Sequence, residues 1–130
     1  MTTKITIENK NQLLASKYSN NRLLYLIYGD TCKPCQELKP KLFELLDNNS
    51  NNGVVVGMIS YKASKEINEY FNLKKIPYLV ACIDSKIIDT IQSSKMELVH
   101  PFLEKSFGVE FLKCGNTGVN EDDDFMDMDF

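Results

Sequence analysis

Residues 23–35 join an unbroken apolar run to two closely spaced cysteines: Leu23-Leu24-Tyr25-Leu26-Ile27-Tyr28, then Gly29-Asp30-Thr31, then Cys32-Lys33-Pro34-Cys35. The apolar run predicts a strand buried on both faces. From Cys32 onward, apolar residues recur at helical spacing, at Cys35, Leu38, Leu42, Leu45 and Leu46. A thiol pair between a buried strand and a helix N-terminus is typical of a low-pKa, disulfide-forming cysteine.

The rest of the chain alternates between strand and helix patterns. Strands are predicted over Lys4–Ile7, Val54–Ile59, Tyr78–Ile83 and Ile87–Ile91. Helices are predicted over Asn11–Tyr18, Ser64–Phe71 and from about Ser94 to Phe107. Side chains expected to face the core from these helices include Tyr18, Tyr70 and Leu98. Pro34 suits a first helical turn, whereas Pro40 predicts a kink in its helix.

This order, β-α-β-α-β-α-β-β-α, predicts an α/β fold with one central mixed sheet and helices on both of its faces. The strands that alternate with helices should pair in parallel, and the late hairpin should add an antiparallel edge. Residues 1–110 are expected to form the domain. Residues 111–130 form an acidic C-terminal tail, and its high charge and low apolar content predict disorder.

Composition excludes several classes of function. The chain has 130 residues, 43% of them hydrophobic, and a formal net charge of −3. There is no basic stripe, which argues against a nucleic-acid partner. No signal-peptide pattern and no apolar run of membrane-spanning length are present. We therefore expect a soluble, intracellular and cytoplasmic monomer with one domain.

The two cysteines fit thiol–disulfide exchange, in which one thiolate attacks a disulfide and a second thiol resolves the mixed disulfide. The helix N-terminus favours the thiolate of Cys32, so Cys32 is the expected nucleophile and Cys35 the resolving residue. Lys33 adds a nearby positive charge that acts in the same direction. Lys33 and Pro34 are therefore the expected thiolate-stabilising residues.

Over roughly residues 4–107 the chain resembles thioredoxin. The resemblance is carried by Cys32-Lys33-Pro34-Cys35, by Pro40 five residues after the second cysteine, and by Lys75-Ile76-Pro77 before the next strand. It implies a thioredoxin fold, a cis bond at Pro77, and substrate binding by Ile76 and Pro77. It also implies protein disulfides as substrates, re-reduction by a thioredoxin-reductase-like partner or by glutathione, and no cofactor.

The chain departs from the thioredoxin pattern at several positions. Asp30 and Thr31 stand where a Trp usually precedes the first cysteine. A buried acid usually lies at the position of Leu26, and its lysine partner falls near Met58. Tyr78 replaces the common Thr after the proline. These differences suggest a specialised protein with a restricted set of partners.

The cysteines and the single histidine also allow other interpretations of the function. A zinc site would need further ligands, which Cys82, Cys114 and His100 do not supply at suitable spacing. Cys82 is expected to be buried and inert, Cys114 a passive thiol and His100 a surface residue. A glutathione-dependent, glutaredoxin-like enzyme is a second possibility. A third is a redox-inactive adaptor that binds partners through its acidic tail.

The tail itself has two interpretations. It can be a solvated, disordered terminus. Alternatively, Phe125-Met126-Asp127-Met128-Asp129-Phe130 resembles the C-terminal tail of the small subunit of class I ribonucleotide reductase, which docks on the large subunit. That resemblance implies partner binding through Phe125, Asp127, Asp129 and Phe130. The large subunit would then be a candidate partner, since a tethered docking tail raises the local concentration of the redox centre.

Overall fold

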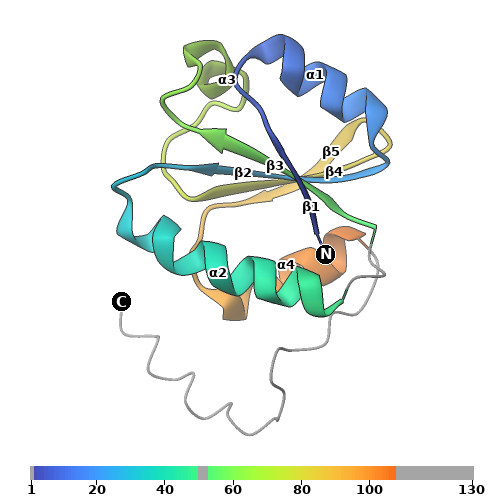
Figure 1. The fold of residues 1–130 in the computed structure, drawn as a ribbon, viewed down its shortest axis with the longest axis vertical. Coiled ribbons are helices and arrows are strands. Elements are labelled where there is room, and N and C mark those ends of the chain that lie inside the picture. Colours follow the sequence, from blue (N-terminus) through green and yellow to red (C-terminus); the bar gives the residue numbers. More distant parts are fainter. Residues whose placement is uncertain (1, 50–52, 108–130) are drawn as a thin grey trace, which may run out of the picture.

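A computed structural model describes residues 2–49 and 53–107 of the chain. It contains a five-stranded sheet with the strand order β1-β3-β2-β4-β5 (Figure 1). The strands are β1 Thr3–Thr6, β2 Arg22–Tyr28, β3 Val55–Ser60, β4 Tyr78–Ile83 and β5 Lys86–Ile91. The helices are α1 Lys10–Ser19, α2 Lys33–Asn48, α3 Lys65–Tyr70 and α4 Met96–Phe107. Every element predicted from the sequence is present, with small shifts at its ends.

The sheet is mixed, as the order of the elements predicts. Strand β3 pairs in parallel with both β1 and β2, whereas β4 is antiparallel to β2 and to β5. The hairpin between β4 and β5 turns at Asp84 and Ser85, whose φ angles are 53° and 72°. Two consecutive positive φ angles are the geometry of the tight turn that matches the twist of a hairpin.

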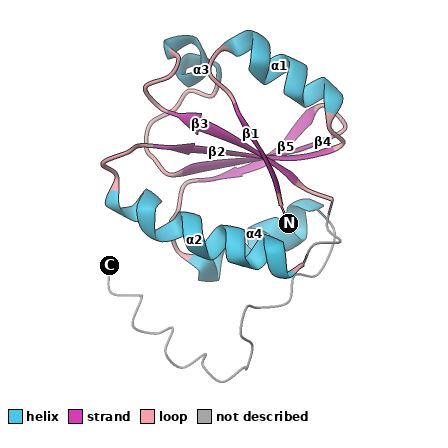
Figure 2. Cartoon of the chain, viewed as in Figure 1, coloured by secondary structure: helices cyan, strands magenta, loops and turns pink. Residues whose placement is uncertain are grey.

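Helices α1 and α3 cover one face of the sheet, and α2 and α4 cover the other (Figure 2). Central strand β2 supplies both cores, because successive side chains of a strand point to opposite faces. Leu24 and Leu26 pack on the α2–α4 side, and Leu23, Tyr25 and Ile27 pack on the α1–α3 side. All five side chains are fully buried. The prediction of a strand buried on both faces is confirmed.

Helix α2 begins immediately after Cys32, which caps its N-terminus. Pro34 lies in the first turn, where its missing N–H group has no intrahelical partner to lose. The helix continues through Pro40 as one element. The whole predicted apolar stripe is buried, namely Cys35, Leu38, Leu42, Leu45 and Leu46. Burial of this stripe fixes the helix, and therefore the cysteine pair, against the sheet.

Three of the side chains expected to face the core are instead exposed. Tyr18 is 75% exposed, Tyr70 is 37% exposed and Leu98 is 49% exposed. The core-facing residues of α1 are Leu13 and Ser16, so Tyr18, two residues further on, points to the opposite side. In α4 the buried stripe starts at Val99, which leaves Leu98 outside it.

Within residues 2–49 and 53–107, no helix is both long and apolar enough to cross a membrane. Helix α4 is the last described element and ends at Phe107. The predicted domain boundary at residue 110 and the acidic tail lie outside the described residues.

Candidate active site

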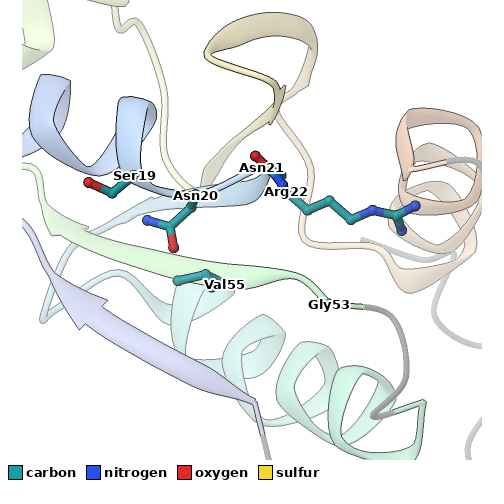
Figure 3. A pocket seen from close by; sticks show the side chains of 6 residues that line it. All are labelled: Ser19, Asn20, Asn21, Arg22, Gly53 and Val55. Carbon is teal, nitrogen blue, oxygen red and sulfur yellow. The ribbon is translucent and has the colours of Figure 1, made fainter.

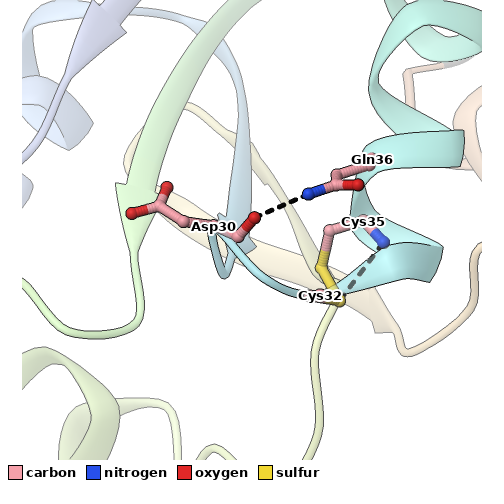
Figure 4. The surroundings of a disulfide bond; sticks show 4 residues. All are labelled: Asp30, Cys32, Cys35 and Gln36. Atoms are coloured by element: carbon pink, nitrogen blue, oxygen red, sulfur yellow. Dashed lines mark hydrogen bonds between the residues drawn. A yellow bond between two sulfur atoms is a disulfide. The ribbon is translucent and has the colours of Figure 1, made fainter.

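Cys32 and Cys35 form a disulfide bond at the N-terminus of α2, with their Cα atoms 5.2 Å apart (Figure 4). The backbone N–H group of Cys35 donates a hydrogen bond to Cys32 Sγ, at 3.2 Å. This is the interaction that a capping side chain makes with a free amide of the first helical turn. The same amide is placed to stabilise negative charge on the sulfur once the disulfide is reduced.

The two cysteines differ in their access to solvent. Cys32 is partly exposed, whereas Cys35 is fully buried. Lys33 and Pro34, which lie between them, are both exposed. A disulfide on another protein can therefore approach the sulfur of Cys32 but not that of Cys35.

The loop before α2 is held in place by backbone atoms. The N–H group of Cys32 donates to the Gly29 carbonyl at 3.3 Å, and that of Gln36 donates to the Cys32 carbonyl at 3.1 Å. The Gln36 side-chain amide donates to the Asp30 carbonyl at 2.6 Å, while the Asp30 carboxylate points away from the disulfide (Figure 4). Gln36 was not expected from the sequence, because a polar residue on an exposed helix face has no distinctive pattern.

A second loop meets this one at Gly29. A Cβ atom on Gly29 would lie 2.8 Å from Ile76 Cδ1 and 3.0 Å from Tyr61 Cε1. Ile76 is partly buried, Pro77 is buried, and the bond between them is cis, as the resemblance implies. Of the two residues expected to bind substrate, Ile76 therefore packs against the loop that leads to Cys32. Tyr61, which directly follows β3, packs there too and was not foreseen from the sequence.

We expect Gly29→Ala to impair reduction of protein disulfides, because the new methyl group must displace Ile76 or Tyr61. A displacement of this kind beside a reacting centre is expected to lower kcat/KM by about tenfold. Steady-state reduction of insulin disulfides measures it. Adding Ile76→Val removes the nearest contacting atom and should restore part of the rate. An unchanged kcat/KM for Gly29→Ala would show that this contact does not shape the site.

Leu26 and Met58 occupy the positions at which the thioredoxin pattern has a buried acid and its lysine partner, and the two residues are neighbours in the structure. Leu26 on β2 is fully buried and lies directly beside Met58 on β3 in the sheet register. Within the described residues no charged side chain is buried, and apart from tyrosines and cysteines the buried side chains with polar groups are Ser16 and Ser106. No described carboxylate is therefore buried in the core beneath the cysteine pair.

Cys82 is a free cysteine on β4 with 1% exposure. Burial raises its pKa to about 11, with a smaller opposing effect from the charge of Lys17. The interpretation of Cys82 as a buried, inert thiol agrees with this placement. The pKa of Cys82 is higher in the folded protein than in the unfolded chain, where it is about 8.5. Its contribution to stability is therefore fully present below about pH 8.5 and is lost as the pH rises toward the folded pKa of about 11.

We expect Cys82 to resist alkylation in the native protein. At pH 8 its thiolate fraction is more than about 100-fold below that of an ordinary thiol, and burial adds a steric barrier. Peptide mass spectrometry after iodoacetamide treatment reports each cysteine separately. Cys82 should be labelled only after unfolding in urea, and rapid labelling of the folded protein would contradict the placement.

His100 lies on α4 and is less exposed than expected. Its side chain is 14% exposed, and its Nε2 atom is 3.3 Å from Glu104 Oε2. It sits beside Val99, which packs into the core and draws this part of the helix against the sheet. Among the described residues, no three His, Cys, Asp or Glu side chains gather to hold a metal ion. Cys114 and the predicted tail residues Phe125, Asp127, Asp129 and Phe130 lie outside the described residues.

A polar pocket lies at the other end of β2, where the strand begins (Figure 3). It is lined by Ser19, Asn20, Asn21, Arg22, Gly53 and Val55. The strand of seven residues that separates it from the cysteine loop is about 23 Å long. The pocket contains no cysteine and is not part of the redox site.

The fold and the cysteine pair define a class of protein, the thiol–disulfide oxidoreductases with a mixed sheet covered by helices on both faces. A protein-family model described as Thioredoxin matches residues 2–104. The chain therefore belongs to the thioredoxin family. The fold class and the type of activity predicted from the sequence are confirmed.

Solved thioredoxin structures share this fold at low sequence identity. Thioredoxin from Malassezia sympodialis (Mala s 13) matches with a TM-score of 0.72 and 13% identity over 82% of this chain and 96% of that one. Oxidised mitochondrial thioredoxin 3 from Saccharomyces cerevisiae matches with a TM-score of 0.70 and 19% identity, over 80% and 94%. Plasmodium falciparum thioredoxin matches with a TM-score of 0.69 and 15% identity, over 78% of this chain and 97% of that one. No curated protein matches the chain.

Proposed function

We propose that this protein reduces disulfide bonds in other proteins, with Cys32 as nucleophile and Cys35 as resolving residue. The observation that carries the proposal is the difference in exposure between the two, Cys32 being accessible and Cys35 buried one helical turn away. The Cys32 thiolate attacks one sulfur of the substrate disulfide and releases the other as a thiolate. Cys35 then loses its proton and attacks Cys32 Sγ, which frees the second substrate thiol. Two electrons pass from the cysteine pair to the substrate.

The surroundings support this assignment of roles. The first-turn amide of Cys35 and the positive charge of Lys33 favour a thiolate on Cys32. Ile76, which packs at Gly29 in the loop leading to Cys32, and Pro77 beside it in the chain would bind the substrate backbone. Since Leu26 and Met58 replace the usual acid and lysine, the proton of Cys35 must leave to water or to the departing substrate thiolate.

Reduction of insulin by dithiothreitol tests the proposal. Catalytic amounts of the protein should accelerate cleavage of the interchain disulfides well above the rate with dithiothreitol alone. A rate no higher than that background would contradict it. The variant carrying both Cys32→Ser and Cys35→Ser is the matched control, since it keeps the fold without the thiols. The rate at which the oxidised protein is re-reduced is then measured with a thioredoxin-reductase-like enzyme and with glutathione in turn.

We further propose that residues 1–110 form the catalytic domain and that residues 111–130 act as a docking tail. The resemblance of Phe125-Met126-Asp127-Met128-Asp129-Phe130 to the ribonucleotide reductase small-subunit tail supports the large subunit of that enzyme as a restricted partner. A tethered tail would hold the redox centre near the disulfide it reduces.

Deleting residues 121–130 is expected to weaken binding to the large subunit by about tenfold or more, because the docking segment is lost. Surface plasmon resonance with the immobilised large subunit measures the change. The variant Phe125→Ala with Phe130→Ala should bind as weakly as the deletion. Equal binding by the full chain and the deletion variant would eliminate this partner assignment.

A further inference from the structure

We propose that Gln36 is a positioning residue for the nucleophile: its side chain holds the backbone of Asp30 so that the Asp30 carboxylate stays turned away from Cys32. A negative charge is thereby kept away from the sulfur that must become a thiolate. The proposal deepens the proposed reductase function and rests on it for its kinetic consequence. The Gln36 side chain acts only through the loop that leads to Cys32 and has no part in the chemistry itself.

The loop of residues 29–31, between β2 and the cysteine pair, is held by few hydrogen bonds. The Gly29 carbonyl accepts from the backbone N–H group of Cys32 at 3.3 Å. The Asp30 carbonyl accepts from Gln36 Nε2 at 2.6 Å, and within the described residues this is the one hydrogen bond that Asp30 makes. Among the same residues, Thr31 makes none. The middle of the loop therefore depends on a single side chain.

Gln36 is itself fixed by the helix. Its backbone N–H group donates to the Cys32 carbonyl at 3.1 Å, in the first turn of α2. The residue before it, Cys35, is fully buried. From this fixed position the Gln36 side chain reaches back across the turn to Asp30 (Figure 4). Because neither bonding group belongs to a cysteine, reduction of the disulfide leaves this hydrogen bond in place.

The direction of the Asp30 side chain follows from this bond. Figure 4 shows the Asp30 carbonyl turned toward Gln36 and the carboxylate directed away from the disulfide. The carbonyl and the side chain share one backbone with two soft dihedral angles, so holding the first restricts the second. Within the described residues, the Asp30 carboxylate makes no hydrogen bond or salt bridge that would hold it there instead.

The direction of this carboxylate matters because Asp30 is close to Cys32 in the chain. Asp30 lies two residues before Cys32, so their Cα atoms are at most about 7 Å apart. A negative charge within about 6 Å disfavours the formation of a second one. If the loop turned, the Asp30 carboxylate would oppose the stabilisation that the Cys35 amide gives to negative charge on Cys32 Sγ.

Four other charged residues lie in the first turns of α2 or adjoin the residues that pack at Gly29, namely Lys33, Glu37, Lys62 and Lys75. Within the described part of the chain, none of them forms a hydrogen bond or a salt bridge with residues 29–31. Their influence on Cys32 should therefore not depend on Gln36. Glu37 in particular is a second carboxylate near the pair, and the helix itself fixes its backbone.

Alkylation of the reduced protein tests the proposal without reference to turnover. Gln36→Met keeps the length of the side chain but removes its donor, so Asp30 is released. Iodoacetamide should then modify Cys32 about threefold to fivefold more slowly at pH 6 than in the unmodified protein, because the thiolate fraction is lower. Peptide mass spectrometry follows Cys32 separately from the other cysteines. An unchanged rate would overturn the proposal.

Two further backgrounds identify the charge that is responsible. In Asp30→Asn the carboxylate is absent, so adding Gln36→Met should change the alkylation rate by less than about 1.5-fold. In Glu37→Gln the other carboxylate is absent, and adding Gln36→Met should keep its full effect. An equal effect in both backgrounds would overturn the proposal, because Gln36 would then act by a route other than Asp30.

The pH profile of insulin reduction tests the consequence for turnover. In Gln36→Met the acidic limb of kcat/KM should move to higher pH by about 0.5–0.7, which corresponds to the same threefold to fivefold change. Urea denaturation checks for a purely structural role, since the bond is exposed and its loss should change stability little. A lower stability with unchanged alkylation and an unchanged pH profile would overturn the proposal.

The two proposals can fail separately. If the unmodified protein does not reduce insulin, the proposed function is refuted, and the alkylation rates still decide the role of Gln36. If insulin is reduced but Gln36→Met alters neither alkylation nor the pH profile, the positioning role is refuted and the proposed function stands.

Discussion

Replacing Cys32 with serine is expected to lower catalytic reduction of insulin by at least about a thousandfold, because the attacking sulfur is lost. Cys35→Ser should have a comparably large effect on turnover for a different reason. Cys32 still attacks, but the mixed disulfide cannot be resolved from within the protein. The Cys35→Ser variant should therefore accumulate in covalent complexes with its substrates, visible on non-reducing gels and by mass spectrometry.

The remaining described cysteine provides the matched control. Cys82→Ser removes a thiol of the same chain that is buried away from solvent and not bonded to the pair. It should keep most of the activity of the unmodified protein at matched folded concentration. Retention of activity by Cys32→Ser, or covalent complexes formed through Cys35 in place of Cys32, would contradict the assigned roles.

Gly57→Ala is expected to cause the largest loss of stability among small substitutions on the sheet. Gly57 on β3 lies beside Tyr25 on β2 in the register, and an added Cβ would lie 2.7 Å from Tyr25 Cδ1. The ring cannot move aside easily, because the Tyr25 hydroxyl donates to the Leu13 carbonyl at 2.9 Å and bonds to Ser16 Oγ at 2.7 Å. Overpacking of this kind costs about 2–3 kcal/mol. The lower entropy of alanine in the unfolded chain offsets less than about 1 kcal/mol.

Urea denaturation measures this effect, with the slope of the transition as a check that two-state unfolding is retained. Tyr25→Leu removes the ring, so adding Gly57→Ala in that background should cost much less than it does alone. The difference between the two costs is the coupling energy of the pair. Equal costs in both backgrounds would show that the ring is not the obstacle.

Most of the fold follows from local patterns in the sequence. The apolar run of β2, the stripe of α2 and the turn at Asp84 and Ser85 each express a rule that acts over a few residues. Errors occurred where a helix face had to be chosen. The aromatic character of Tyr18 and Tyr70 predicts inward-facing side chains, yet Tyr18 is 75% exposed and Tyr70 37% exposed. Aromatic character alone does not set the direction of a side chain on a short helix.

The active site likewise contains features that the sequence predicts and features that only the folded structure reveals. The cysteine pair was predictable from its spacing and its place before a helix, and the cis bond at Pro77 from the resemblance to thioredoxin. The contact of Gly29 with Ile76 and Tyr61 was not, since it joins three separate loops that only the folded sheet brings together.

The central claim is that Cys32 and Cys35 form one redox couple that reduces other proteins. Its most direct test is a redox titration in dithiothreitol buffers, with thiol trapping and mass spectrometry of each cysteine. We expect a single two-electron transition that converts Cys32 and Cys35 together, near the thioredoxin midpoint of about −270 mV, while Cys82 stays reduced. A midpoint of about −180 mV or higher, typical of disulfide isomerases and oxidants, or a failure to form the Cys32–Cys35 disulfide at any potential, would contradict it.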